Sequence, residues 1–268
     1  EGMRLLVVED NLINQQVALE LLRSEGAQVV LAANGQLGVD AVASAVPAFD
    51  AVLMDVQMPV LDGYGATRLI RQQLGLTTLP IIAMTANAMA SDREACLAAG
   101  MDDHIGKPFD LTQLVLLLRR YVRSAQPTAD TDPTKAVSDL RGPTGSVAVL
   151  DVAAALARMA GSTDLYVRAA RDFLVDLPAT VPDFRRLAQV DGLQASMQMH
   201  KLKGAAAMLG ATQLAQAADL LETLCASPSG LASCFDHLVA LQATVQATEA
   251  ALRDAVDAIG FPPAAVMH

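Results

Sequence analysis

The first 124 residues alternate between short runs of β-branched and aliphatic residues and longer amphipathic helical patterns. The runs that predict strands are Arg4–Val8, Gln28–Ala32, Ala51–Met54, Ile81–Thr85 and roughly Asp103–Gly106. The helical patterns cover about Ile13–Ser24, Gln36–Ser44, Gly63–Gln73, Ser91–Ala98 and Asp110–Arg123. Because this alternation places a helix after each strand, it predicts a parallel sheet with helices on both faces. Right-handed crossovers then favour an α/β fold, a doubly wound five-stranded parallel sheet.

A different pattern follows. Residues 125–147 contain three prolines, two glycines and many small polar residues, which predicts a linker. The helical patterns after it cover about Asp151–Ala160, Asp164–Val175, Ala179–Gln189, Leu193–Leu209, Thr212–Ala226 and Leu231–Ile259. Helices with short connections predict an all-α antiparallel helical bundle. We therefore expect two domains, at residues 1–124 and 148–260, with a linker at 125–147 and a tail at 261–268.

Composition and charge exclude several classes of function. The formal net charge is −10 and aromatic residues make up 3% of the chain, so no nucleic-acid partner and no membrane contact by this segment are expected. The three cysteines form no C-x-x-C pair, which argues against a disulfide framework and favours a reducing, cytoplasmic compartment. No apolar run of about 18 residues predicts a membrane span. A longer parent protein could still be anchored in the inner membrane.

Acidic, hydroxyl and ammonium side chains stand at the ends of the predicted strands. Glu9 and Asp10 follow the first strand, Asp55 the third, Thr85 ends the fourth, and Lys107 follows the fifth. Because parallel strands end at one edge of the sheet, these groups are expected to converge. Converging carboxylates need a compensating cation, and oxygen ligands favour Mg²⁺. The set suits an aspartate nucleophile beside a phosphoryl group, whereas a single strand-end aspartate would more simply cap a helix.

The segments VVEDN (Val7–Asn11), MDVQMPVLDG (Met54–Gly63), MTANAM (Met84–Met89) and GKPF (Gly106–Phe109) stand in order with fitting spacing. They resemble the response-regulator receiver domain, in the variant attached to hybrid sensor kinases. The resemblance covers about 120 residues. It implies that Asp55 accepts a phosphoryl group.

The same resemblance implies roles for the neighbouring residues. Thr85 and Lys107 would contact the phosphoryl oxygens. Asp10, Asp55 and the backbone carbonyl of Gln57 would bind Mg²⁺, with Glu9 acting through water. The bond between Lys107 and the following proline would be cis.

One position departs from the receiver pattern. His104 stands three residues before Lys107, where the family often has Tyr or Phe as a rotating switch. An imidazole there could also titrate near neutral pH, so its role stays open.

A single histidine stands out in the second half. Ala195, Met199, Leu202, Ala206 and Leu209 recur at helical spacing and predict a core stripe. His200 points roughly 140° away from the centre of that stripe, with Lys203 and Gly204 on its own side. A nearby Lys203 disfavours the protonated imidazole and can stabilise an incoming phosphoryl charge. Read alone, His200 would be a solvated surface histidine.

The string HKLKGAAAMLGA (His200–Ala211), followed by LLE (Leu220–Glu222), resembles the histidine phosphotransfer (HPt) domain with its H-x-x-K-G core. The resemblance implies that His200 is phosphorylated on a ring nitrogen and that Lys203 assists. It also implies that Gly204 clears space for the active site of a partner.

The two resemblances predict two-component phosphorelay signalling. An upstream histidine kinase domain, expected in the same full-length chain, would donate to Asp55, and the group would pass through His200 to the receiver of a separate response regulator. The segment has no P-loop and no G-x-G-x-x-G, so whether it is itself an enzyme stays open, as does transfer within one chain or between chains. The alternative is a non-catalytic docking or inhibitory module. A phosphatase of the aspartyl-phosphate type is disfavoured, because it needs an acid where Gln57 stands.

Overall fold

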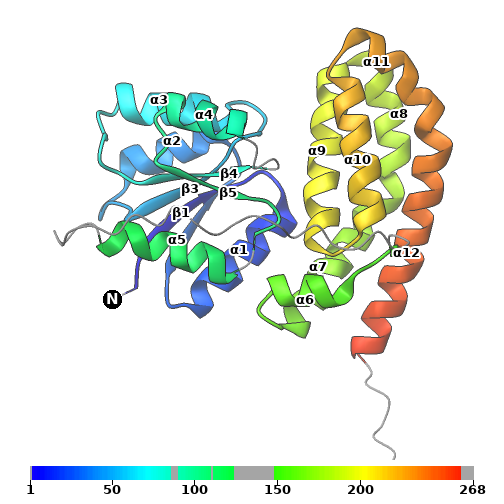
Figure 1. Ribbon diagram of the computed structural model, residues 1–268, viewed down its shortest axis with the longest axis horizontal. Helices are drawn as coiled ribbons and strands as arrows, with labels where there is room; N and C mark the ends of the chain where they lie inside the picture. Colours follow the sequence, from blue (N-terminus) through cyan, green and yellow to red (C-terminus); the bar gives the residue numbers. More distant parts are fainter. Residues whose placement is uncertain (1, 86–89, 110, 124–147, 261–268) are drawn as a thin grey trace, which may run out of the picture.

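The computed structural model describes residues 2–85, 90–109, 111–123 and 148–260 (Figure 1). The predicted linker at 125–147, the tail at 261–268 and residues 86–89 of the MTANAM segment lie outside the described residues, so the domain boundaries stay predictions. An α/β domain is followed by a helical bundle, as expected. Among the described residues, no helix is both long and apolar enough to cross a membrane.

The sheet has the predicted topology. Its strands are β1 (Arg4–Val8), β2 (Gln28–Ala32), β3 (Ala51–Asp55), β4 (Ile81–Thr85) and β5 (Asp103–Gly106). They pair in parallel in the order β2-β1-β3-β4-β5. Every residue of β3 and β4 is buried, which explains why these segments are continuous apolar runs. The strand order reverses between β1 and β3, and the carboxyl ends at such a point are where a site is expected.

Helices cover both faces of the sheet (Figure 1). One face carries α1 (Leu12–Ser24) and α5 (Leu111–Arg123), and the other carries α2 (Gly35–Ser44), α3 (Gly63–Gln72) and α4 (Ala90–Ala99). Alternate residues of β1 pack in the two hydrophobic clusters, one on each face of the sheet. Leu5 packs in one cluster with Leu22 of α1, whereas Leu6 packs in the other with Ile70 of α3.

The bundle contains α6 (Val152–Arg158), α7 (Thr163–Asp176), α8 (Thr180–Val190), α9 (Gly192–Met208), α10 (Thr212–Cys225), α11 (Pro228–Ser233) and α12 (Leu238–Gly260). The helical patterns Asp164–Val175 and Ala179–Gln189 leave a gap that contains Pro178, and the structure has a helix break there. A 3₁₀ turn, η1 (Leu177–Ala179), joins α7 to α8, and the residues on both sides keep right-handed helical dihedrals. The helical path therefore continues past Pro178 as a short 3₁₀ turn, since proline has no N–H to donate to the preceding turn.

The helical patterns Thr212–Ala226 and Leu231–Ile259 leave residues 227–230 between helices, but in the structure α11 begins within them. The Ser227 side chain accepts a hydrogen bond from the backbone N–H of Gly230 at 3.2 Å. Pro228 stands in the first turn of α11, where its missing N–H leaves nothing unsatisfied. A second 3₁₀ turn, η2 (Cys234–His237), leads on into α12. The predicted helix at Leu231–Ile259 thus forms in three consecutive pieces.

Gly210 makes the tight turn between α9 and α10. Its φ is +79°, and a Cβ at this position would lie 2.2 Å from the Asp151 carbonyl oxygen. Only glycine suits both the left-handed conformation and the close approach. The turn lays α10 back along α9, which brings the side chains of α10 next to His200.

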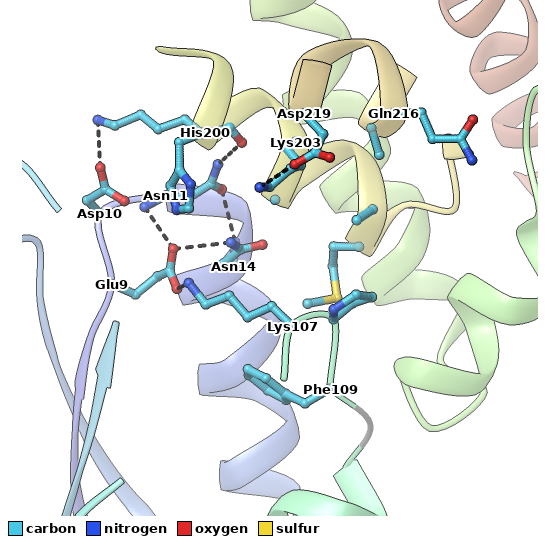
Figure 2. A pocket seen from close by; sticks show the side chains of 16 residues that line it. Glu9, Asp10, Asn11, Asn14, Lys107, Phe109, His200, Lys203, Gln216 and Asp219 are labelled. Atoms are coloured by element: carbon cyan, nitrogen blue, oxygen red, sulfur yellow. Dashed lines mark hydrogen bonds and ion pairs between the residues drawn. The ribbon is translucent and has the colours of Figure 1, made fainter. Parts of the chain in front are cut away.

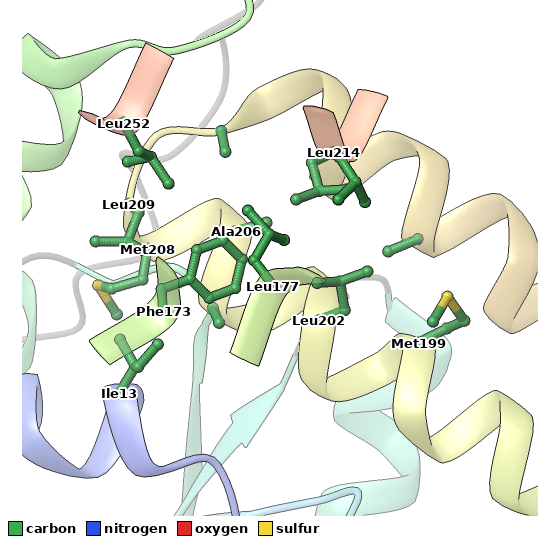
Figure 3. Packing of buried hydrophobic residues seen from close by; sticks show 14 of the residues in the cluster. Ile13, Phe173, Leu177, Met199, Leu202, Ala206, Met208, Leu209, Leu214 and Leu252 are labelled. Atoms are coloured by element: carbon green, nitrogen blue, oxygen red, sulfur yellow. The ribbon is translucent and has the colours of Figure 1, made fainter. Parts of the chain in front are cut away.

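The two domains pack against each other through α1. Ile13, Val17 and Leu21 are 8%, 0% and 3% exposed and belong to the same buried cluster as the bundle residues. Figure 3 shows Ile13 pointing toward Phe173 of α7 and Met208 of α9. The helix therefore has two apolar sides, one on its own sheet and one on the bundle. We call the second side, formed by Ile13, Val17 and Leu21, the docking surface.

Candidate functional site

Three carboxylates converge at the switch point of the sheet. Glu9 and Asp10 follow β1, and Asp55 ends β3. One oxygen from each residue lies within 4.8 Å of the others. Glu9 and Asp55 are each 2% exposed. The structure therefore brings together the three side chains that the sequence places at the strand ends, and we call them the acidic cluster.

Lys107 enters the acidic cluster from the loop after β5 (Figure 2). Its Nζ lies 2.6 Å from Glu9 Oε2 and 2.7 Å from Asp55 Oδ2. The Lys107–Pro108 bond is cis, as the receiver resemblance implies. Burial alone would lower the pKa of the ammonium, but attraction by Asp55 and Glu9 raises it above its usual value. Lys107 therefore stays charged in this site.

Asp55 is a weaker acid than an ordinary aspartate. The pKa of Asp55 is raised from 3.8 to about 6; burial is the largest cause, and the charge of Glu9 also raises it. Lys107 and His200 act in the opposite direction. One ammonium therefore does not fully compensate the buried carboxylates, so the site favours additional positive charge.

We expect Asp55→Asn to raise the free energy of unfolding near neutral pH in a buffer without divalent cations. With a raised pKa, the folded state binds the Asp55 proton more tightly than the unfolded chain. The stability from this group is complete below pH 3.8 and is lost as the pH rises through about 6. Asparagine never takes the charge, so the variant should gain up to about 3 kcal/mol at neutral pH and little in acid.

Thermal unfolding at acid and neutral pH measures this effect. The matched control is Asp172→Asn, which changes an exposed aspartate of the bundle and should show no such pH dependence. An Asp55→Asn gain that is equal at both pH values would contradict the raised pKa.

Gln57 and Thr85 lie at the rim of the acidic cluster. The backbone N–H of Gln57 donates to Asp55 Oδ1 at 3.3 Å, so the backbone of residue 57 lies against this carboxylate. Thr85 ends β4 and is 6% exposed. Both residues line a cavity of about 710 Å³ that extends to His200. His104, at the position that departs from the receiver pattern, lies in β5 with its Nδ1 3.7 Å from Asp103 Oδ1.

His200 lies on α9 and faces the α/β domain. The predicted stripe of Ala195, Met199, Leu202, Ala206 and Leu209 is buried in the bundle. The His200 side chain is only 12% exposed, although the sequence predicts an exposed imidazole. Groups of both domains surround the ring: Glu222 of α10 contacts it, and Asp10 of the α/β domain lines the same two cavities as His200, of about 710 and about 260 Å³. Figure 2 shows His200 directly across from Asp10 and Asn11.

Glu222 of α10 fixes the orientation of the His200 ring. Its Oε1 lies 2.9 Å from His200 Nδ1. Burial raises the pKa of Glu222, but the hydrogen bond and charge of His200, together with Lys203, lower it below the usual value. A charged carboxylate can only accept, so Nδ1 carries the proton. The lone pair of a neutral ring is then on Nε2.

Lys203 interacts with carboxylates of α10 and not directly with the imidazole. Its Nζ lies 2.9 Å from Asp219 Oδ1 and 2.8 Å from Glu222 Oε2. These partners raise the pKa of Lys203 against the lowering effect of burial. Glu222 therefore contacts both Lys203 and His200 and lies between the ammonium and the ring.

Gly204 stands one turn after His200, where α9 meets α1. A Cβ there would lie 3.1 Å from Asn14 Nδ2. The Asn14 side chain in turn donates to Glu9 Oε1 at 3.1 Å. The glycine therefore lets the α9 backbone approach Asn14, which binds Glu9 of the acidic cluster. The sequence also predicts that Gly204 leaves space beside His200.

Polar contacts between the domains surround the docking surface. The Asn11 side chain donates to the Lys201 carbonyl oxygen at 3.0 Å, and Lys201 Nζ lies 3.0 Å from Asp10 Oδ2. Further along α1, Arg168 of α7 forms an ion pair with Glu20. These pairs fix the register of the docking surface, so that His200 lies opposite the acidic cluster.

Two family profiles match this chain. Residues 5–119 match the response regulator receiver domain, and residues 168–259 match the Hpt domain. Together they place the acidic cluster in one family and His200 in the other.

The chain is also similar to parts of known sensor kinases. It is 36% identical over 229 residues to the sensor protein GacS of Pseudomonas syringae, and 33% identical over 226 residues to the histidine-protein kinase BarA of Escherichia coli. Each alignment covers 82% of this chain but 24% of the relative. The chain therefore spans about a quarter of the length of these two kinases.

A solved structure resembles the first domain. It is the receiver domain of a sensor histidine kinase from Pseudomonas aeruginosa, with a magnesium ion coordinated in its active site cleft. The sequences are 48% identical, with a TM-score of 0.42, over 46% of this chain and 98% of that domain.

Four residues of the site have no role in the sequence-based predictions. Asn11 is recognisable as a helix N-cap, since its side chain accepts from the backbone of Ile13 and Asn14, but its contact with Lys201 crosses between domains. Glu222 occurs in the quoted LLE segment without an assigned role. No sequence pattern indicates a role for Asn14 or Lys201. Asn14 binds Glu9 of the acidic cluster, and Lys201 binds Asp10 of the other domain.

Proposed function

We propose that Asp55 passes a phosphoryl group to His200 of the same chain. The chain belongs to the two-component signalling family and joins a response regulator receiver domain to an Hpt domain. Receiver and Hpt modules of hybrid kinases perform Asp-to-His phosphorelay signalling. The observation that supports transfer within one chain is the packing of α1 on the bundle, which sets His200 across a cavity from the acidic cluster.

The first step is the capture of the phosphoryl group. A carboxylate oxygen of Asp55 attacks phosphorus, and the bond from phosphorus to the donor imidazole nitrogen breaks with its electron pair. Lys107, 2.7 Å from Asp55 Oδ2, offers an ammonium to the phosphoryl oxygens. Thr85 lines the cavity that extends to His200. Preorganised positive charge of this kind stabilises charge that develops during transfer.

The second step delivers the group to His200. Nε2 attacks phosphorus, the bond to Asp55 breaks, and Asp55 regains its carboxylate. The ring becomes more cationic as the N–P bond forms, and the Glu222 carboxylate on Nδ1 stabilises that charge. Lys203, held by Asp219 and Glu222, assists from the same helix face.

The residues present fit a magnesium ion. Glu9, Asp10 and Asp55 supply hard oxygen ligands within reach of one another. Burial, with a smaller contribution from the charge of Glu9, keeps the pKa of Asp55 above its usual value even beside Lys107. Asp10, Asp55 and the Gln57 carbonyl would hold the ion directly, and Glu9 through water. When bound, Mg²⁺ neutralises charge on the transferring group.

The proposed transfer also needs a donor and a final acceptor of the phosphoryl group. The donor would be a phosphohistidine of an upstream kinase domain, in a full-length protein that works at the cytoplasmic side of the inner membrane. The acceptor from His200 would be the receiver of a separate response regulator. Because the chain's own receiver domain covers His200, the two domains must separate before that regulator can reach the imidazole.

Acetyl phosphate with Mg²⁺ tests the proposal, because it can donate to an aspartate without a kinase. We expect the wild-type chain to accumulate acid-labile, base-stable phosphohistidine at His200. Asp55→Asn should give none, and His200→Gln should stop at a base-labile acyl phosphate. Transfer within one chain predicts a rate that does not change with protein concentration.

Two results would count against this proposal. If Asp55→Asn labels His200 as fast as the wild type, Asp55 does not precede His200. If a folded wild-type chain takes no label on either residue, the alternative of a non-catalytic docking or inhibitory module is the better assignment.

A further inference from the structure

Lys201, the residue after His200, binds two consecutive residues of the receiver domain. Its Nζ lies 3.0 Å from Asp10 Oδ2, and its carbonyl oxygen accepts a hydrogen bond from the Asn11 side chain at 3.0 Å. The Lys201 side chain is 42% exposed, whereas that of Asp10 is only 4% exposed. The ammonium therefore reaches from a partly solvated position into the edge of the acidic cluster.

Asp10 is the carboxylate that links docking to the acidic cluster. Lys107 already pairs with Glu9 and Asp55, and Lys201 supplies the positive charge at Asp10. A divalent cation on Asp10 and the Lys201 ammonium would lie within a few ångströms of each other and repel. Binding of the cation and formation of the Lys201–Asp10 pair are therefore antagonistic.

We propose that Lys201 couples the docking of the Hpt domain to divalent-cation binding by the receiver domain. The Lys201–Asp10 pair weakens Mg²⁺ binding in the docked chain. By reciprocity, bound Mg²⁺ weakens the docking contact by the same factor. This inference rests on the magnesium site of the proposed function. Lys201 acts through Asp10 and does not itself contact the phosphoryl group, so it is a positioning residue.

The structure provides a matched comparison, because a second ion pair joins the two domains beside the docking surface. Arg168 forms the ion pair with Glu20 near the other end of α1, roughly 12 Å along the helix from Leu12. Loss of the Arg168–Glu20 pair or of the Lys201–Asp10 pair weakens docking. Of these two pairs, only Lys201–Asp10 contains a carboxylate of the acidic cluster. A direct effect on the cation site should therefore be specific to Lys201.

Titration calorimetry of the whole two-domain chain with Mg²⁺ is the first test. We expect Lys201→Met to bind Mg²⁺ at least about fivefold more tightly than the wild type, the lower end of typical coupling between two sites. Lys201→Arg keeps the charge and should restore wild-type affinity. Arg168→Gln should leave the affinity within about twofold, because an exposed ion pair contributes little.

Chemical labelling of lysine amines gives a second readout that is independent of activity. Acetylation of Lys201, followed by mass spectrometry, should become faster when Mg²⁺ is added. Lys203 keeps its partners Asp219 and Glu222 within the bundle, so its labelling should increase less than that of Lys201.

The outcomes separate the two proposals. Equal Mg²⁺ affinities of wild type and Lys201→Met, or an Arg168→Gln effect as large as that of Lys201→Met, would overturn the role of Lys201 and leave the magnesium site intact. Binding of Mg²⁺ to neither protein would overturn the magnesium site itself, and the coupling with it. Unchanged Lys201 labelling with Mg²⁺ bound would also reject the coupling.

Discussion

Replacing Val17 by aspartate should slow transfer from Asp55 to His200 within one chain by about 10²–10³-fold. Val17 is 0% exposed and belongs to the cluster that α1 shares with the bundle. Docking would bury an unpaired carboxylate, at a cost of about 3–5 kcal/mol, so the domains separate instead. The measurement is the rate of phosphohistidine formation after acyl phosphate has formed on Asp55.

The Val17→Asp variant has a built-in test of folding. Val17 packs on the bundle, whereas Ala18 and Leu22 hold α1 on its own sheet, so the receiver domain should stay folded and acetyl phosphate should still label Asp55. The matched control is Leu37→Asp, the same type of change on α2 at a side chain that is 48% exposed, and it should transfer normally. Unchanged transfer in Val17→Asp would mean that the docked arrangement is not the one that reacts.

Glu222→Ala is the second change with a large expected effect. Without the carboxylate 2.9 Å from Nδ1, the ring loses both its fixed tautomer and the partner that stabilises its developing charge. Loss of such an orienting partner typically lowers activity by about 10–100-fold. Single-turnover transfer from Asp55 to His200 should slow by this amount, while acyl phosphate formation on Asp55 stays as in the wild type.

Two further variants show whether Glu222 acts through the imidazole. Glu222→Gln keeps an acceptor oxygen and should recover part of the rate, with a pH profile shifted because the charge beside the ring is gone. Asp219→Ala removes the other carboxylate partner of Lys203 and spares the His200 hydrogen bond, so it should have a small effect. Equal losses in Asp219→Ala and Glu222→Ala would assign the effect to Lys203 and not to the ring.

Sequence patterns were sufficient for most of the fold. Continuous apolar runs such as Ala51–Met54 predict strands buried on both faces, and β3 is such a strand. Strand-end residues such as Asp55 could be placed at one edge, because parallel strands share that edge. The connection at Pro178 was harder to predict, since a proline that ends a helix and a proline in a 3₁₀ turn between two helices look alike in the sequence.

In the candidate site, too, the sequence predicts local features but not contacts between distant segments. His200 could be placed opposite the apolar stripe of α9 by helical periodicity, which is a local property. The cover over its imidazole, the Glu222 hydrogen bond and the Lys201–Asp10 pair could not be predicted. Each of them joins residues of different helices or of different domains.

The amino-acid sequence by itself determined the two folds, the order of the domains and the choice of candidate site residues, because local periodicity and strand-end position depend only on neighbours along the chain. The tertiary structure alone decided that α1 presents a second apolar side to the bundle, and that His200 therefore faces the acidic cluster of its own chain. Such docking depends on the match of two distant surfaces in shape, apolar area and charge, and no segment of the sequence contains that match.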